Sequence, residues 1–167
     1  STMKTNWHQY FSNIAKQVAS RSTCVRAQHG CVLVRDNQIL STGYNGSPPK
    51  CDECIVEGCY MVDNHCERCN HAEVNAICQA SKSGVLLYSH DSPTIAYITG
   101  IPCHECVRTL LGTGIKHFCI PDECMLSWET QFNEPTNAED VIRKSFIEQS
   151  NAIMFFSSNK LCYNLKP

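Results

Sequence analysis

The sequence predicts an α/β fold in which a mixed sheet lies between layers of helices. Two apolar runs, 31–34 and 39–42, are joined by the polar residues Arg35 to Gln38, and they predict a β-hairpin. After the hairpin, segments with helical periodicity alternate with short apolar segments, which is typical of strands sharing one sheet that helices cover. The length of 167 residues suits a single domain, 1–167, with one sizeable core.

Each further element is assigned from its own pattern. Apolar residues between Trp7 and Val18 recur at helical spacing, so residues 6–20 are expected to form an amphipathic helix. Gly84 can end a helix over 71–83. Residues 122–137 are expected to be irregular. The remaining predictions are helices at 103–111 and 138–149 and strands at 95–99, 115–120 and 152–156.

Composition excludes several classes of function. The net charge is -2, and no basic run offers a surface for long nucleic acid. The sequence has no apolar stretch of about 18 residues and no apolar leader, so neither a membrane span nor a signal peptide is expected. We therefore expect a cytoplasmic protein with no membrane partner.

Cysteine is used to excess, with thirteen in the chain. Without a secretory signal, such an excess indicates metal or thiol chemistry before disulfides. The predicted loop at about 43–70 is rich in Cys, Gly, Pro and Asp, and a loop of this length in a compact domain is usually functional or held by metal. We expect a zinc-stapled loop.

The strongest chemical signal joins segment 71–73 (His-Ala-Glu) with segment 102–106 (Pro-Cys-His-Glu-Cys). His71, Cys103 and Cys106 would supply one nitrogen and two thiolates to a tetrahedral Zn²⁺ and leave a fourth position for water, as in catalytic zinc sites. Glu73, two residues from a ligand, can move protons to and from that water. Either half alone would also fit a structural zinc or a redox pair, but Glu73 favours the catalytic interpretation.

Seven segments spread over residues 7–120 together resemble the deoxycytidylate deaminases of bacteria and phages, within the zinc-dependent cytidine deaminase superfamily. The resemblance implies a three-layer α/β/α cytidine deaminase-like fold with a central mixed sheet of about five strands. It also implies hydrolysis of dCMP to dUMP and ammonia by a homo-oligomer, often a hexamer. In this family dCTP commonly activates and dTTP inhibits, and Mg²⁺ would accompany a triphosphate effector. The segments are 21–26, 43–46, 57–60, 65–66, 71–76, 102–106 and 114–116.

The resemblance assigns the catalytic roles residue by residue. His71, Cys103 and Cys106 correspond to the zinc ligands. Glu73 corresponds to the group that protonates N3 of cytosine and then the departing amino group.

The resemblance also assigns nucleotide contacts. The Ala72 backbone N–H corresponds to the group that fixes the base carbonyl, Asn45 to a deoxyribose contact, and Arg26 to a basic residue near the 5′-phosphate. Asn before Gly is also a turn signal, and a single Arg is also typical of a solvated surface. The effector site would include Gly43, Tyr44, Asn45 and Gly46.

Ligand-type residues in the loop exceed the needs of one zinc. Spacing alone allows a zinc-ribbon-like set of two Cys-x-x-Cys pairs, whereas the resemblance favours a set that ties the end of the first helix to the loop. We expect the second set, which would leave Cys51 and Cys69 as spare thiols. The first set is Cys51, Cys54, Cys66 and Cys69; the second is Cys24, Cys54, Cys59 and Cys66, with His65 as a substitute.

One segment departs from the family pattern. Members usually carry a tyrosine, often followed by a basic residue, where this chain has Glu123, Cys124 and Met125. Met125 cannot neutralise a phosphate, so dCTP or a base-modified deoxycytidine nucleotide is the alternative substrate. A polynucleotide-editing deaminase and a non-catalytic zinc module are more distant alternatives, which the net charge and Glu73 respectively disfavour.

Overall fold

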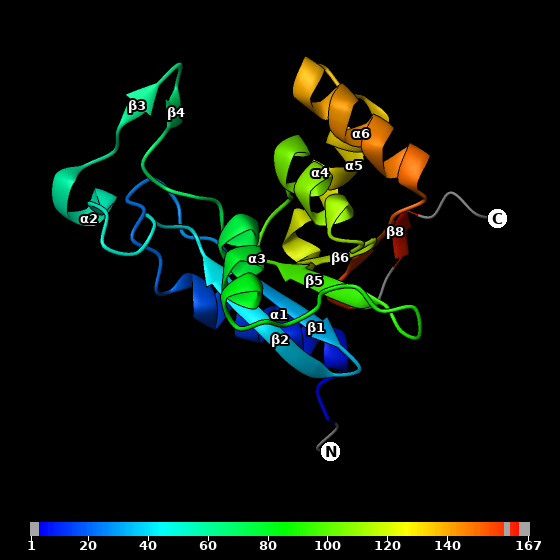
Figure 1. Cartoon of the computed structure of the whole chain (residues 1–167). Coiled ribbons are helices and arrows are strands. Elements are labelled where there is room, and N and C mark those ends of the chain that lie inside the picture. The colour runs from blue at the N-terminus through cyan, green and yellow to red at the C-terminus, as the bar shows by residue number, and fades with distance from the viewer. Residues whose placement is uncertain (1–3, 159–160, 164–167) are drawn as a thin grey trace.

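Figure 1 shows a computed structural model of the chain, which describes residues 4–158 and 161–163. Each predicted helix and strand is present, in the predicted order, and its observed ends lie within about three residues of the predicted ones. In chain order the elements are α1 (Trp7–Ala19), β1 (Gly30–Arg35), β2 (Gln38–Tyr44), α2 (Cys54–Glu57), β3 (Met61–Val62), β4 (His65–Cys66), α3 (Ala72–Lys82), β5 (Thr94–Ile98), α4 (His104–Gly112), β6 (His117–Ile120), the 3₁₀ turn η1 (Asp122–Cys124), α5 (Met125–Asn133), α6 (Ala138–Ser150), β7 (Ile153–Phe156) and β8 (Leu161–Tyr163).

The central sheet is mixed, as predicted, and its strand order is β2-β1-β5-β6-β7-β8. β1 pairs antiparallel with β2 and with β5, whereas β6 pairs parallel with β5 and with β7. β8 adds an antiparallel edge beside β7. The sheet therefore has six strands where about five were expected, because no strand was predicted after residue 156.

Helices cover both faces of the sheet, which confirms the three-layer architecture (Figure 1). On one face, α1 packs Phe11 and Ala15 against Val32 and Tyr97. The other face carries the larger core, to which α3, α4, α5 and α6 contribute. Because side chains alternate along a strand, neighbouring residues of β1, β5 and β6 supply the two cores in turn.

The expectation that residues 122–137 are irregular is wrong. A 3₁₀ turn and α5 occupy residues 122–133. Trp128 and Phe132 of α5 are buried in the larger core, and Met125 packs against it at the same helical spacing. The apolar residues of this helix recur at helical spacing, but their burial depends on the core formed with α4 and α6, so residues 122–137 alone did not predict it.

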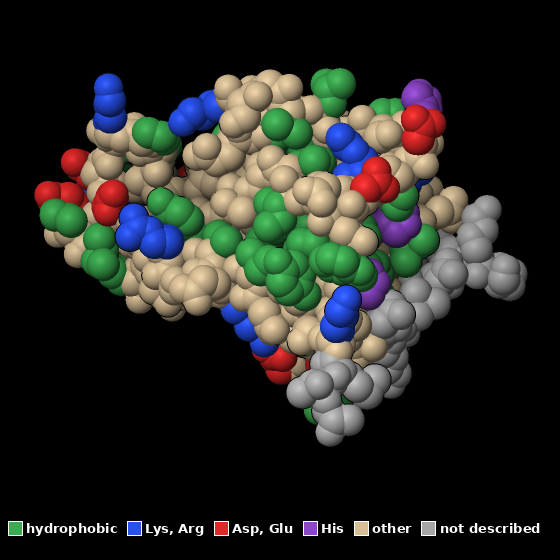
Figure 2. All heavy atoms as spheres, turned by 90° about the horizontal axis from the view of Figure 1, so that it is seen from below, with side chains coloured by type: hydrophobic (Ala, Val, Ile, Leu, Met, Phe, Trp, Pro, Cys, Tyr) green, Lys and Arg blue, Asp and Glu red, His purple; other side chains and the backbone are tan. Residues whose placement is uncertain are grey.

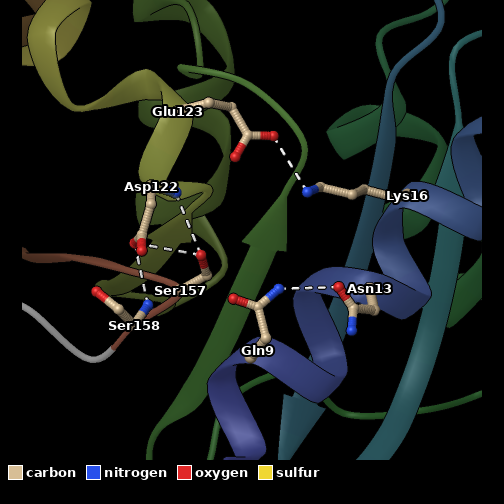
Figure 3. A network of polar contacts seen from close by, with 7 residues as sticks. All are labelled: Gln9, Asn13, Lys16, Asp122, Glu123, Ser157 and Ser158. Carbon is tan, nitrogen blue, oxygen red and sulfur yellow. Dashed lines mark hydrogen bonds and ion pairs between the residues drawn. The ribbon is translucent and has the colours of Figure 1, made fainter. Parts of the chain in front are cut away.

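Polar contacts attach this region to the rest of the fold (Figure 3). Glu123 forms an ion pair with Lys16 of α1, with Oε1 and Nζ 3.1 Å apart. Asp122 accepts hydrogen bonds from the Ser157 hydroxyl at 3.3 Å and from the Ser158 N–H at 3.0 Å. The chain after β6 is thereby held between α1 and the end of β7.

The outer face of α1 keeps aromatic side chains partly exposed. Trp7 and Tyr10 remain 55% and 46% exposed, and their rings meet edge to face at 5.6 Å. Figure 2 looks at the molecule from below and shows hydrophobic side chains gathered in the middle of this side of the molecule. None of the described helices is both long enough and apolar enough to cross a membrane.

A close contact between backbones fixes α3 on the sheet. A Cβ atom at Gly43 of β2 would collide with the backbone of Ala76 and Ala72 in α3. Glycine is therefore required for β2 and α3 to approach this closely. The residue before α3 is His71, so this packing also positions the predicted metal site.

Candidate active site

The predicted zinc ligands come together at the ends of two helices. His71 is the N-cap residue of α3 and Cys103 is the N-cap residue of α4, and neither side chain caps its own helix. Both side chains therefore face each other instead. The ligand atoms of His71, Cys103 and Cys106 all lie within 4.8 Å of one another. This donor set and its compactness fit a zinc ion.

Contacts among the three predicted ligand side chains shift their pKa values. His71 Nδ1 lies 3.3 Å from the Cys106 sulfur and 3.6 Å from the Cys103 sulfur. The contact with Cys103 raises the pKa of His71 to about 9, and the contact with Cys106 lowers the pKa of Cys103 to about 3. The same sulfur–sulfur contact raises the pKa of Cys106. Because zinc takes thiolates and a neutral imidazole, metal binding here releases protons.

Glu73 lies in the first turn of α3 and is only 5% exposed. Burial raises the pKa of its carboxyl group, and its own backbone N–H and the Cys106 thiol form hydrogen bonds that oppose this shift. The carboxyl group therefore adjoins the metal ligands while remaining able to hold a proton.

A cavity of about 420 Å³ opens onto these residues. Its volume is in the range that accepts a small ligand. Of the predicted residues, His71, Glu73 and Cys103 line it, together with Ala72, Asn45 and Arg26. The structure thus brings two of the three predicted metal ligands and the predicted substrate contacts to one cavity, and the third ligand, Cys106, is buried next to them. Six further lining residues were predicted neither as metal ligands nor as substrate contacts: Ala27, His29, Asn70, Ile98, Gly100 and Ile101.

Asn45 has a well-defined structural task in addition to lining the cavity. Its side chain accepts a hydrogen bond from the His29 N–H and donates one to the Ala27 carbonyl, both at 2.8 Å. The turn signal in Asn45 and Gly46 thus coincides with a side chain that holds the loop before β1. One amide N–H of Asn45 takes no part in these two bonds.

Residues 43–46, the predicted effector segment, connect three parts of the fold. Asn75 of α3 donates to the Tyr44 carbonyl at 2.8 Å, and Gly46 forms a backbone bridge with Asn70. The Ser22 hydroxyl donates to the Asn45 carbonyl at 2.8 Å. This segment therefore links the end of α1, the cysteine-rich loop and α3.

A second group of thiols lies in the loop between β2 and α3. The sulfur atoms of Cys54, Cys59 and Cys66 are within 4.8 Å of one another, so Cys59 rather than Cys51 completes this group. Cys69, expected to be a spare thiol, lies with its sulfur 3.2 Å from that of Cys54. Cys24 lines the cavity together with Cys66 and Cys69.

The thiols of Cys54 and Cys66 differ strongly in pKa. Burial raises the pKa of Cys54 to about 12. Burial also acts on Cys66, but backbone N–H groups of residues 60, 68 and 69 outweigh it and lower the pKa of Cys66 to about 6. A thiolate is thus available at neutral pH, as a metal site needs.

The segment that departs from the family pattern lies away from the cavity. Glu123 is paired with Lys16 on α1, and Met125 packs against the larger core. None of residues 123–125 is among the described residues that line the cavity. The departure from the family pattern therefore falls on residues that pack against α1 and the larger core, outside the described wall of this cavity.

Solved structures share this fold. The chain superposes on the apo form of the dCMP deaminase from cyanophage S-TIM5 with a TM-score of 0.63, at 19% identity, over 92% of this chain and 99% of that one. The same phage protein in complex with dCMP and dUMP gives a TM-score of 0.60 at 24% identity, over 72% of this chain and 84% of that one. At these identities the likeness establishes the fold.

Several curated proteins are more similar to this chain in sequence than these solved structures are. The chain is 43% identical to "ComE operon protein 2" of Bacillus subtilis over 113 residues, 68% of this chain and 58% of that protein. It is 31% identical to the deoxycytidylate deaminase of Saccharomyces cerevisiae over 159 residues, 91% of this chain and 49% of the yeast protein. The chain thus spans about half the length of these two relatives. With the deoxycytidylate deaminase of Mycobacterium phage D29 the identity is 30% over 131 residues, 72% of this chain and 98% of that protein.

The family profile described as "Cytidine and deoxycytidylate deaminase zinc-binding region" matches residues 5–121. This range runs from α1 through β6 and contains every residue of the metal group and of the cavity wall. The chain therefore belongs to the zinc-binding cytidine and deoxycytidylate deaminase family.

Proposed function

We propose that this chain catalyses the hydrolysis of dCMP to dUMP and ammonia. The observation that carries the proposal is the buried Glu73 carboxyl group beside the ligand set of His71, Cys103 and Cys106, because a purely structural zinc site has no need of an adjacent acid. The names of the yeast and phage relatives support dCMP as the substrate. The cyanophage enzyme of the same fold is described in complex with dCMP and dUMP.

The residues of the chain divide the chemistry between them. When bound, zinc would make a water molecule acidic near neutral pH. Glu73 would take a proton from that water and deliver protons to N3 of the base and to the exocyclic amine. The water oxygen bonds to C4, the C4–N bond breaks, and ammonia leaves. Ala72 is the first residue of α3, so its N–H has no intrahelical acceptor and is available to the base carbonyl.

The charges of the cavity support an anionic substrate. Arg26, a permanent cation, lines its wall, whereas burial lowers the pKa of His29 and favours its neutral form. Glu73 carries the only carboxyl group among the described lining residues. Arg26 is exposed, and its Nη1 reaches the Asn64 carbonyl at 3.4 Å. We assign Arg26 to the 5′-phosphate, where it would replace the basic group that residues 123–125 do not provide.

A second zinc held by Cys24, Cys54, Cys59 and Cys66 would fasten the cysteine-rich loop to the end of α1. The grouping of Cys54, Cys59 and Cys66 supports this part of the proposal. Two other residues could supply the fourth ligand in place of Cys24. They are Cys69, whose sulfur contacts that of Cys54, and His65, which precedes Cys66 in the chain. Such a site would stabilise a segment that has almost no apolar core of its own.

Regulation and assembly are proposed on the family resemblance. A homo-oligomer, in its usual form a hexamer, would bind dCTP or dTTP at Gly43, Tyr44, Asn45 and Gly46, with Mg²⁺ accompanying the triphosphate. The links from this segment to the cavity loop and to α3 support it, because a ligand that displaced the segment would also displace residues that line the cavity.

The proposal is tested by measuring ammonia release from deoxycytidine, dCMP, dCTP, CMP and 5-methyl-dCMP with the zinc-loaded protein. We expect dCMP to be the best substrate by kcat/KM. A preference for dCTP or 5-methyl-dCMP would establish the alternative substrate instead. Absence of ammonia from every compound would reject the deaminase assignment.

A further inference from the structure

A buried arginine outside the family-matched region forms a hydrogen bond with the residue that precedes a predicted zinc ligand. Arg143 lies on α6, beyond the matched residues 5–121, and is only 6% exposed. Its Nη1 donates to the Pro102 carbonyl at 3.3 Å. Pro102 immediately precedes the ligand Cys103, so this contact joins α6 to the peptide from which a zinc ligand projects.

The guanidinium group is fixed by further partners. Nη2 donates to Gln131 Oε1 at 2.7 Å and to Asp140 Oδ1 at 2.9 Å. The guanidinium carbon also lies 5.7 Å from the centre of the Trp128 ring. Because a buried cation is costly unless it is paired, these contacts hold Arg143 in one orientation. A guanidinium group can serve partners in three directions at once, which a lysine ammonium on a flexible chain cannot do in the same geometry.

The partners of Arg143 are themselves positioned by secondary structure. Asp140 lies in the first turn of α6, where its N–H donates to the N-cap residue Asn137 at 2.8 Å. Gln131 belongs to α5, the helix that was not expected from the sequence. Helices α5 and α6 therefore supply the groups that hold Arg143 beside Pro102.

We propose that Arg143 is a positioning residue that orients Cys103 as a zinc ligand through the Pro102 carbonyl. This inference rests on the proposed zinc site at His71, Cys103 and Cys106. Residues that orient metal ligands from outside the ligand set affect metal affinity or activity by about 10- to 100-fold when they are changed. Burial lowers the pKa of Arg143, and the opposing charges of Asp140 and Cys103 partly offset this shift, which agrees with a cation close to the Cys103 thiolate.

The test compares zinc affinity among matched variants of the full chain, by competition with a chelator. Arg143→Met removes the guanidinium group and retains side-chain bulk. Arg143→Lys retains the positive charge but lacks the branched guanidinium group. Arg108→Met is the control, because Arg108 is exposed on the same helix as Cys106. Cys103→Ala identifies which of the bound zinc ions belongs to this site.

We expect Arg143→Met to bind that zinc about 10- to 100-fold more weakly than Arg108→Met, and Arg143→Lys to fall between them. In the dCMP assay kcat should fall while KM stays within about twofold, because Arg143 does not line the cavity. If Arg143→Met loses its fold, as judged by circular dichroism and loss of all zinc, Arg143→Lys alone decides.

Affinities of the folded Arg143 variants within about twofold of Arg108→Met would overturn the inference and leave the proposed function standing. A wild-type chain that binds no zinc through Cys103 would overturn both. A wild-type chain that binds this zinc but deaminates nothing would reject only the proposed activity, since the affinity comparison would still decide the role of Arg143.

Discussion

His71 Nδ1 lies 3.3 Å from the sulfur of Cys106, although one residue precedes α3 and the other belongs to α4. The two helices meet there because each packs on the same face of the sheet. The metal site therefore depends on helix packing as well as on its ligands.

Replacing Gly43 tests this dependence. Gly43→Ala should lower the free energy of unfolding by about 1–3 kcal/mol, because its Cβ would collide with the α3 backbone. It should also lower dCMP turnover, because α3 carries Glu73. The control is Gly112→Ala, where a Cβ meets no atom within 4 Å and the backbone is not strained. Denaturant unfolding that gives both variants equal stability would contradict the close packing of β2 on α3.

A second metal site predicts how many zinc ions each chain binds. Elemental analysis should find two zinc ions per chain, and Cys54→Ala should retain one of them, with a loss of several kcal/mol of stability. Cys24→Ser should behave similarly, whereas Cys69→Ser should retain both ions. If instead Cys24→Ser retained both ions and Cys69→Ser lost one, Cys69 would be the fourth ligand. A single zinc in the demetallated and reloaded wild-type chain would contradict the second site.

The assignment of Arg26 predicts a selective effect on the phosphorylated substrate. A charge-assisted contact of about 1.5–3 kcal/mol corresponds to a rise in KM for dCMP of roughly 10- to 100-fold in Arg26→Ala. Turnover of unphosphorylated deoxycytidine should change little. Arg21→Ala, an exposed arginine in the same segment, serves as the control. Equal losses on nucleotide and nucleoside would assign Arg26 to the structure of the loop.

The environment of His8 predicts that this residue makes a pH-dependent contribution to the free energy of unfolding. Its Nδ1 lies 2.8 Å from the Tyr97 hydroxyl, its ring meets Phe155 edge to face, and burial lowers its pKa. The folded state therefore favours neutral His8, and this stabilisation is present above the unfolded pKa of about 6.5 and is lost as pH falls through the lower folded pKa.

We expect the wild-type chain to lose stability relative to His8→Gln between pH 7.5 and pH 5. Zinc ligands titrate equally in both proteins, so the difference between their unfolding free energies isolates His8. A constant difference across this range would show that His8 does not titrate on unfolding.

Local patterns predicted the elements that carry the site. The apolar period of α1, the hairpin of β1 and β2, and the helix starts at His71 and Cys103 are each encoded within about fifteen residues, and the structure has them in place. The three predicted ligands also meet, because both of their segments begin helices on one face of the sheet.

Contacts between distant segments were not predictable in the same way. Arg143 and Pro102 are separated by 41 residues, and no local pattern distinguishes this arginine from a solvated one. Cys69 is similarly indistinguishable by spacing from Cys51, yet only Cys69 contacts Cys54 among these two. The burial of α5 depends on the core formed by α4 and α6, which the sequence of residues 122–137 does not contain.

The central claim is that Glu73 performs proton transfer at a zinc site that deaminates dCMP, and turnover by the zinc-loaded Glu73→Gln variant tests it most directly. The variant retains the size of the side chain and the metal ligands, so its zinc content should equal that of the wild-type chain. Formation of dUMP should fall by at least about 100-fold, as expected for the loss of a general acid and base. Near-normal turnover by a variant with full zinc content would contradict the account.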